Sequence, residues 1–171
     1  MKGNLTPLDY AYRLLSQRAY STHDLAAKMR GKGFTSQVVE QAVERLTIQG
    51  YLNDVKLAAD MTSRLQTRGY GPAGIKQKLV QKGLDRDLVE HTVEARESDR
   101  DLEAARKLVA SRFSADKLQQ VRIHARAFRL LLRRGYSYDV AKQLLGNPPR
   151  ENAQGAKNAE DTEDIQNAED A

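Results

Sequence analysis

The chain of 171 residues contains no cysteine. This absence excludes a disulfide framework, a zinc site built from thiolates and a cysteine nucleophile, and it favours a reducing, intracellular compartment. Long apolar runs are also lacking, since runs such as 130–132 are short and the start, MKGNLTPLDY, has no apolar signal-peptide core. We therefore expect a cytoplasmic protein that has no membrane partner.

Charge is distributed unevenly along the chain. Of 28 Lys and Arg and 23 Asp and Glu residues, segment 147–171 holds 2 basic and 7 acidic ones, a net charge of −5. The other 26 basic and 16 acidic residues give positions 1–146 a net charge of +10, which suits a polyanion or an acidic protein surface. Segment 147–171 has one large apolar residue, Ile165, so we expect a disordered tail.

An internal repeat emerges when the sequence is shifted by 50 positions. The shift aligns VVEQAVE at 38–44 with LVEHTVE at 88–94, and KGF at 32–34 with KGL at 82–84. A third, partial copy begins where RGYS at 134–137 matches RGYG at 68–71, and this copy lacks a last helix. The expected units are 1–52, 53–97, a linking helix with a partial repeat at 98–146, and a tail at 147–171.

Each copy has the pattern of three helices, because apolar residues recur at spacings of three and four between cap signals. In the second copy, Asn53 or Asp54 begins the first helix, Pro72 the second and Asp85 the third. Gly69 supplies the left-handed residue that ends the first of these helices, and Gly83 stops the second. No stretch alternates like a strand, so the expected fold is all-α, with tandem three-helix repeats in an elongated, curved array.

Two sets of residues are expected to contribute to packing. A long helix over 117–134 has an apparent inner stripe formed by Leu118, Val121, Ala125, Phe128 and Leu132. Aromatic residues that follow the turns should pack back onto the preceding helix ends; they are Tyr20, Phe34, Tyr51, Tyr70 and Tyr136.

The same long helix carries the clearest charge feature of the chain. Four arginines recur beside the inner stripe, about 100° round the helix, and basic residues flank them; the six are Lys117, Arg122, Arg126, Arg129, Arg133 and Arg134. No acid lies between positions 117 and 138, so ion pairs within the helix cannot offset their repulsion. This favours an external anion, unless Asp99, Asp101 or Glu103 neutralises the arginines from another helix.

A smaller basic patch is expected in the second repeat. Its members are Arg68, Lys76, Lys78 and Lys82. We interpret both basic groups as candidate partner-binding residues.

Patterns for catalysis, cofactors and metals are missing. The G-x-G-x-x-G at 69–74 follows a helix rather than a strand, which argues against a nucleotide site. His23, His91 and His124 lie too far apart in sequence to indicate a metal site. No activated nucleophile or carboxylate pair is present, so we expect no enzyme activity, no cofactor and no small-molecule ligand.

Several segments in a fixed order make the chain resemble the RecX family. They are RAYS at 18–21, DL at 24–25, KGF at 32–34, GYLND at 50–54, RGYGP at 68–72, KL at 78–79, KGL at 82–84 and LRRGYS at 132–137. The resemblance extends over about 8–145, whereas the short third copy and the acidic tail depart from the family pattern.

The resemblance implies a regulator of the RecA recombinase. Family members lie in the groove of the RecA filament on single-stranded DNA, lower its ATP hydrolysis and strand exchange, and thereby modulate DNA repair and the SOS response. RecA is thus the implied partner, while direct contact with single-stranded DNA is left open.

Two other classes of function are compatible with parts of the sequence. Segments 24–29, 31–34 and 38–46 could form a DNA-binding helix-turn-helix, although the second helix carries only Arg45 against Glu40 and Glu44. A purely structural adaptor would also fit a repeat architecture.

Overall fold

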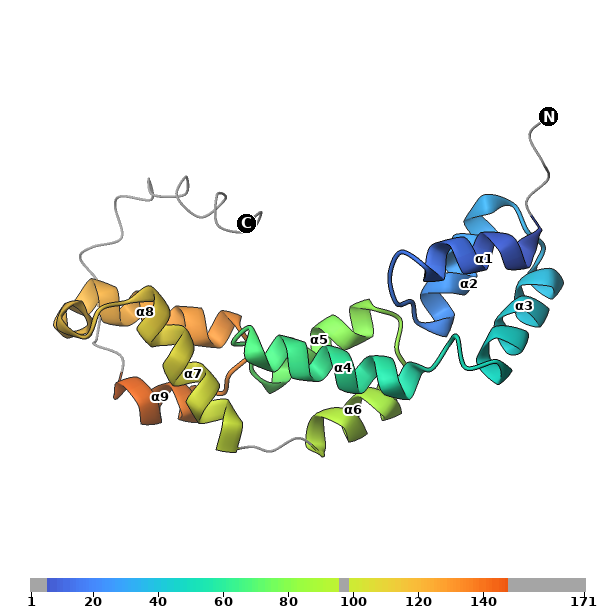
Figure 1. Cartoon of the computed structure of the whole chain (residues 1–171). Helices are drawn as coiled ribbons and strands as arrows, with labels where there is room; N and C mark the ends of the chain where they lie inside the picture. The colour runs from blue at the N-terminus through green and yellow to red at the C-terminus, as the bar shows by residue number, and fades with distance from the viewer. Residues whose placement is uncertain (1–5, 96–98, 148–171) are drawn as a thin grey trace.

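The computed structural model of the chain describes residues 6–95 and 99–147, and within these ranges all regular elements are helical. Figure 1 shows three helical units laid end to end in an elongated array. The first unit comprises α1 (Pro7–Leu15), α2 (Thr22–Lys32) and α3 (Ser36–Ile48), and the second α4 (Asp54–Thr67), α5 (Pro72–Gln81) and α6 (Arg86–Glu94). The third comprises α7 (Asp99–Arg112), the 3-10 helix η1 (Ala115–Gln119), α8 (Val121–Arg133) and α9 (Tyr138–Leu145). The all-α repeat architecture is therefore confirmed, while the predicted tail lies almost entirely outside the described residues.

Local cap signals set the helix boundaries in the second unit. The side chain of Asn53 accepts from the amide of Lys56 at the start of α4, and that of Asp85 accepts from two amides at the start of α6. Pro72 begins α5, where a missing amide proton costs no helical hydrogen bond. Gly83 has a φ of 74°, which lets the chain turn back after α5. These four predictions are confirmed.

Each unit has its own hydrophobic core. Leu25, Met29 and Leu46 are fully buried in the first unit, and Ile75 and Leu79 in the second. In the third, α7 packs against α9 and supplies Ala105, Leu108 and Val109 to a core shared with α8. Because the three cores are separate, the relative placement of the units depends on the contacts at their joints.

Two packing predictions need correction. The segment 117–134 is not one helix, because η1 ends at Gln119 and α8 begins afresh at Val121. The core side of α8 consists of Ala127, Phe128 and Leu131, whereas Val121 and Leu132 are 53% and 41% exposed. The predicted inner stripe was therefore wrong by about a quarter turn of the helix.

The aromatic residues after the turns mostly pack as expected. Tyr20 and Tyr136 are buried, and Phe34 and Tyr70 are half-buried. Tyr51 is the exception, since it is 59% exposed and its ring meets that of Tyr12 in a T-shaped contact, while the next residue, Leu52, takes the buried position.

Both joints between units connect the start of one helix to the end of another. At the first joint, the Ser21 hydroxyl at the start of α2 donates to the carbonyl of Lys82 at the end of α5, with an O–O distance of 2.6 Å. At the second, the amide of Gly71 at the start of α5 donates to the carbonyl of Arg134 at the end of α8, at 2.8 Å. At each joint the carbonyl at the end of one helix thus accepts from a group at the start of the next helix, and α8, α5 and α2 follow one another head to tail along the array.

Candidate partner-binding surface

The four arginines of α8 lie on the face of the helix turned away from the core. We call Arg122, Arg126, Arg129 and Arg133 the α8 stripe, and all four are exposed. At about 100° per residue, their mean direction lies about 180° from that of the buried residues Ala127, Phe128 and Leu131. The α8 stripe therefore points directly away from the core, whereas the prediction placed it about 100° from the buried face.

The described carboxylates of α7 do not neutralise the α8 stripe. Asp101 on α7 accepts a hydrogen bond from Gln66 at 3.4 Å, and Glu103 pairs with Lys107 at 2.7 Å on the same helix. No ion pair to the four arginines is found among the residues that the structure describes. The side chain of Asp99 lies outside the described part. Of the three acids that were expected as possible partners of the arginines, Asp99 is therefore the one that stays open.

An apolar edge runs beside the α8 stripe. Val121 and Leu132 are exposed on the flank of α8, and Tyr138 at the start of α9 is 50% exposed while its ring contacts Phe128 at a centroid distance of 5.2 Å. Sequence reasoning missed this edge because it placed Val121 and Leu132 in the core. Combined charged and apolar groups on one surface are typical of protein interfaces, where exposed apolar patches mark contact sites.

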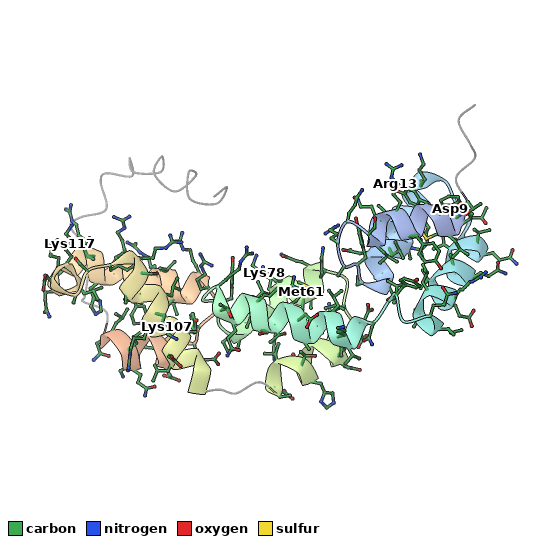
Figure 2. The ribbon with its side chains drawn as sticks, in the orientation of Figure 1. Asp9, Arg13, Met61, Lys78, Lys107 and Lys117 are labelled. Atoms are coloured by element: carbon green, nitrogen blue, oxygen red, sulfur yellow. The ribbon has the colours of Figure 1, made fainter. Side chains whose placement is uncertain are left out.

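The residues that flank the α8 stripe have different surroundings. Lys117 lies on η1 and is exposed, at the outer end of the array in Figure 2. Arg134 turns toward the second unit, where its guanidinium lies 4.5 Å from the centre of the Tyr70 ring and contacts the carbonyl of Arg68. Arg134 is therefore part of the second joint, and Lys117 extends the exposed cationic surface.

The predicted patch in the second unit does not form one cationic surface. Lys76 pairs with Glu90 of α6, and Lys82 pairs with Asp24 of α2 at 3.3 Å. Lys78 lies over the Tyr70 ring at 4.8 Å and points to the same edge of the array as Lys117 in Figure 2. Two of the three lysines thus have carboxylate partners that come from other helices.

Arg68 lines a shallow groove between α4 and α7, with a volume of about 470 Å³. Lys107 and Arg112 of α7 also line this groove, together with Ser63 and Ser111. The predicted candidate residues omitted Lys107 and Arg112, because nothing in the sequence pattern brings α7 against α4.

The glycines at 69–74 have a packing role. A Cβ atom on Gly74 would lie 2.3 Å from the Arg134 carbonyl oxygen, and one on Gly71 would lie 2.6 Å from the Tyr136 nitrogen. The missing side chains allow two backbone hydrogen bonds across the joint, from Gly71 to Arg134 and from Ala73 to Gly135. The glycines at 69–74 thus allow the close contact between the start of α5 and the end of α8.

Membrane-spanning helices and clusters of metal ligands are absent from the described part of the chain. None of its helices is long and apolar enough to span a membrane. Among the same residues, no group of three or more His, Cys, Asp or Glu side chains could hold a metal ion.

Three domain models of one protein family match the chain in order. They are the first, second and third three-helix domains of RecX, which match residues 8–46, 56–93 and 99–145. The chain belongs to the RecX family. The third match includes α7, so the helix expected as a linker lies within the family's third domain.

Individual RecX proteins agree with this assignment. The chain is 34% identical over 131 residues to the regulatory protein RecX of Xanthomonas campestris pv. campestris (strain B100), covering 77% of this chain and 80% of the relative. It is 32% identical over 136 residues to that of Pseudomonas entomophila (strain L48), covering 79% and 86%. The crystal structure of RecX from Lactobacillus salivarius shares the fold, with a TM-score of 0.70 and 21% identity over 81% of this chain and 92% of that one.

Proposed function

We propose that this RecX-family chain is a regulatory protein that binds the RecA filament on single-stranded DNA and lowers its ATP hydrolysis and strand exchange. Such an activity would modulate recombinational DNA repair and the SOS response. Matches to regulatory RecX proteins over most of the chain support the regulatory role. The α8 stripe, whose four exposed arginines form no ion pair with the described carboxylates, is the observation that supports a polyanionic partner.

The chemistry of the α8 stripe suits a filament made of protein and nucleic acid. Arginine presents a planar fork of donors that binds phosphate or carboxylate groups in pairs. The apolar edge at Val121 and Leu132 offers contact area that a nucleic acid backbone alone would not fill. A mixed surface of this kind fits a partner that combines phosphates with protein side chains.

The test is the rate of ATP hydrolysis by RecA on single-stranded DNA as this protein is titrated in. We expect inhibition at well below one regulator per RecA monomer, weakened by salt because the contacts are ionic. A variant in which all four stripe arginines are replaced by glutamine should need an at least about tenfold higher concentration for half-inhibition.

A matched variant separates the position of the charges from their number. Lys28→Gln, Arg30→Gln, Arg45→Gln and Lys56→Gln together remove four exposed charges from α2, α3 and α4, far from α8. This variant should inhibit RecA nearly as well as the unchanged protein. Equal loss in both variants would contradict the assignment to the α8 stripe, and no inhibition by the unchanged protein would contradict the proposed function.

The helix-turn-helix alternative receives no support from the first unit. The helix that would enter the DNA groove, α3, exposes Glu40 and Glu44 beside Arg45. Two carboxylates on this face would repel the phosphates on either side of the major groove.

A further inference from the structure

We propose that the acidic segment 148–171 of this chain docks on the α8 stripe and competes there with other polyanions. The proposal concerns the α8 stripe itself, and only its consequence for RecA rests on the proposed function. The segment is thus an internal competitor for the face that the partner would use.

The charges of the two parts are complementary. Positions 147–171 hold 7 acidic and 2 basic residues, and four of the acids are gathered within five positions at Glu160, Asp161, Glu163 and Asp164. The α8 stripe carries four arginines for which the described residues supply no carboxylate. Opposite charges that lie on one chain attract at low salt without the cost of bringing two molecules together.

The described chain ends next to the helix that carries the α8 stripe. Nε2 of His124 on α8 lies 2.7 Å from the carbonyl oxygen of Leu145, the last residue of α9. Leu145, two residues before the end of the described chain, therefore lies about one helix diameter from the arginines of α8 nearest to His124, since an α-helix with its side chains is about 10–12 Å across.

The length of the segment is sufficient to reach the whole α8 stripe. Asp161 lies fifteen positions after Gly146, and an extended chain spans at most about 3.3–3.6 Å per residue, or about 50 Å over this stretch. The 13 residues of α8 span only about 20 Å at about 1.5 Å per residue. The four clustered acids can thus pass round α8 and lie along its outer face.

The apolar edge of α8 adds a second match. Ile165 is the one large apolar residue of the segment and directly follows Glu163 and Asp164. Val121 and Leu132 are exposed on the flank of the α8 stripe. An isoleucine beside paired carboxylates can bury apolar area on this edge while the carboxylates contact the arginines.

The docked segment can be detected without RecA. Because the chain has no cysteine, Thr162→Cys provides a single thiol for a nitroxide spin label within the acidic cluster. At about 50 mM salt, where ionic screening is weak, the label should broaden the NMR amide signals of α8 residues 122–133 in the full chain. Signals of α3 should stay unaffected, and the broadening of α8 should be lost at about 0.5 M salt.

Three outcomes of this measurement would overturn the proposal. They are unbroadened α8 signals at low salt, equal broadening of α3 and α8, and broadening that persists when Glu160→Gln, Asp161→Asn, Glu163→Gln and Asp164→Asn are introduced together. Mixing spin-labelled protein at natural isotope abundance with unlabelled, isotope-enriched protein tests the origin of the effect. In that mixture, only contact between two molecules can broaden the signals. Broadening as strong as in a chain that carries both the spin label and the isotopes would mean that the segment docks on a second copy, which would contradict docking within one chain.

The competition is measured with a fluorescent oligo-dT probe. The variant with four neutralised acids should bind this probe about three- to tenfold more tightly than the unchanged chain at about 50 mM salt, and equally at about 0.5 M. A control with Glu40→Gln, Glu44→Gln, Asp60→Asn and Glu94→Gln removes four exposed acids elsewhere and should gain much less. Equal gains in both variants would show a general charge effect and overturn the competition, whatever RecA assays report.

Discussion

The joint between the first and second units depends on a side chain, whereas the joint between the second and third depends on the absence of one. Ser21 and Gly71 occupy the same position in their repeats, since the repeats are related by a shift of 50 residues. Ser21 is fully buried and bridges the start of α2 to the end of α5 with its hydroxyl. Gly71 lets its own backbone amide bind the end of α8 directly.

The difference teaches how one repeat position can build two kinds of interface. At the first joint the Ser21 hydroxyl bridges the two helix ends, so the backbones stay apart and other polar groups can contribute. The amide and the hydroxyl of Thr22 donate to the Asp54 carboxylate at 3.0 and 2.7 Å. Direct backbone contact leaves no room for side chains at Gly71 and Gly74 and fixes the two helix ends by main-chain geometry. The second joint should accordingly tolerate substitution less well than the first.

Exchanging the glycine for the serine of the other repeat should give the largest effect. In Gly71→Ser the added Cβ would lie 2.6 Å from the Tyr136 nitrogen, so the turn after α8 has to move away. We expect the free energy of unfolding to fall by about 2–3 kcal/mol, through overpacking and weakened backbone hydrogen bonds. Chemical denaturation followed by circular dichroism measures this loss, and hydrogen exchange should show reduced protection of the Ala73 amide.

The φ of Gly71 is −81°, an ordinary value for any residue, so lack of space is the only reason for glycine here. A stable Gly71→Ser protein with a protected Ala73 amide would therefore mean that the second joint adapts as easily as the first. The inference that the second joint tolerates an added side chain less well than the first would then be wrong.

An intermediate effect is expected at the serine of the first joint. Ser21→Ala removes both the cap on the Asp24 amide and the hydrogen bond to the Lys82 carbonyl. The loss should be about 1.5–2.5 kcal/mol, because the Lys82 carbonyl loses this partner in a partly buried setting in addition to the lost cap. Denaturation under the same conditions provides the measurement, and a loss below about 0.5 kcal/mol would show that the joint does not depend on the hydroxyl.

Much of this fold could be predicted because its signals are local. Asn53, Pro72 and Asp85 begin helices by chemistry confined to a single turn, and a glycine after α5 ends one. The orientation of α8 about its axis could not be predicted in this way. Apolar residues lie on two adjacent sides of that helix, and only the contacts of Phe128 and Leu131 with α7 and α9 decide which side is buried.

The candidate surface was predicted in part for a related reason. The exposure of the α8 stripe follows from the spacing of its arginines, which is a property of one helix. The partners of Lys76 and Lys82 come from α6 and α2, at sequence distances that no helical spacing indicates. Interactions between separate helices therefore set the limit of what the sequence alone reveals here, and the binding role of these residues stays a prediction.

The smallest effect is expected at the third copy of the same repeat position, Ser137. Its hydroxyl caps the amide of Val140 at 3.2 Å but is exposed, and this cap is the one hydrogen bond found for it in the described structure. Ser137→Ala should cost about 0.5–1 kcal/mol, the value of an exposed N-cap alone. In denaturation experiments, the amount by which Ser21→Ala exceeds Ser137→Ala then measures the contribution of the first joint. Equal losses would assign the whole effect of Ser21 to capping of its own helix. The first joint would then be stabilised by the ion pair between Lys82 and Asp24 and by the hydrogen bonds between Thr22 and Asp54.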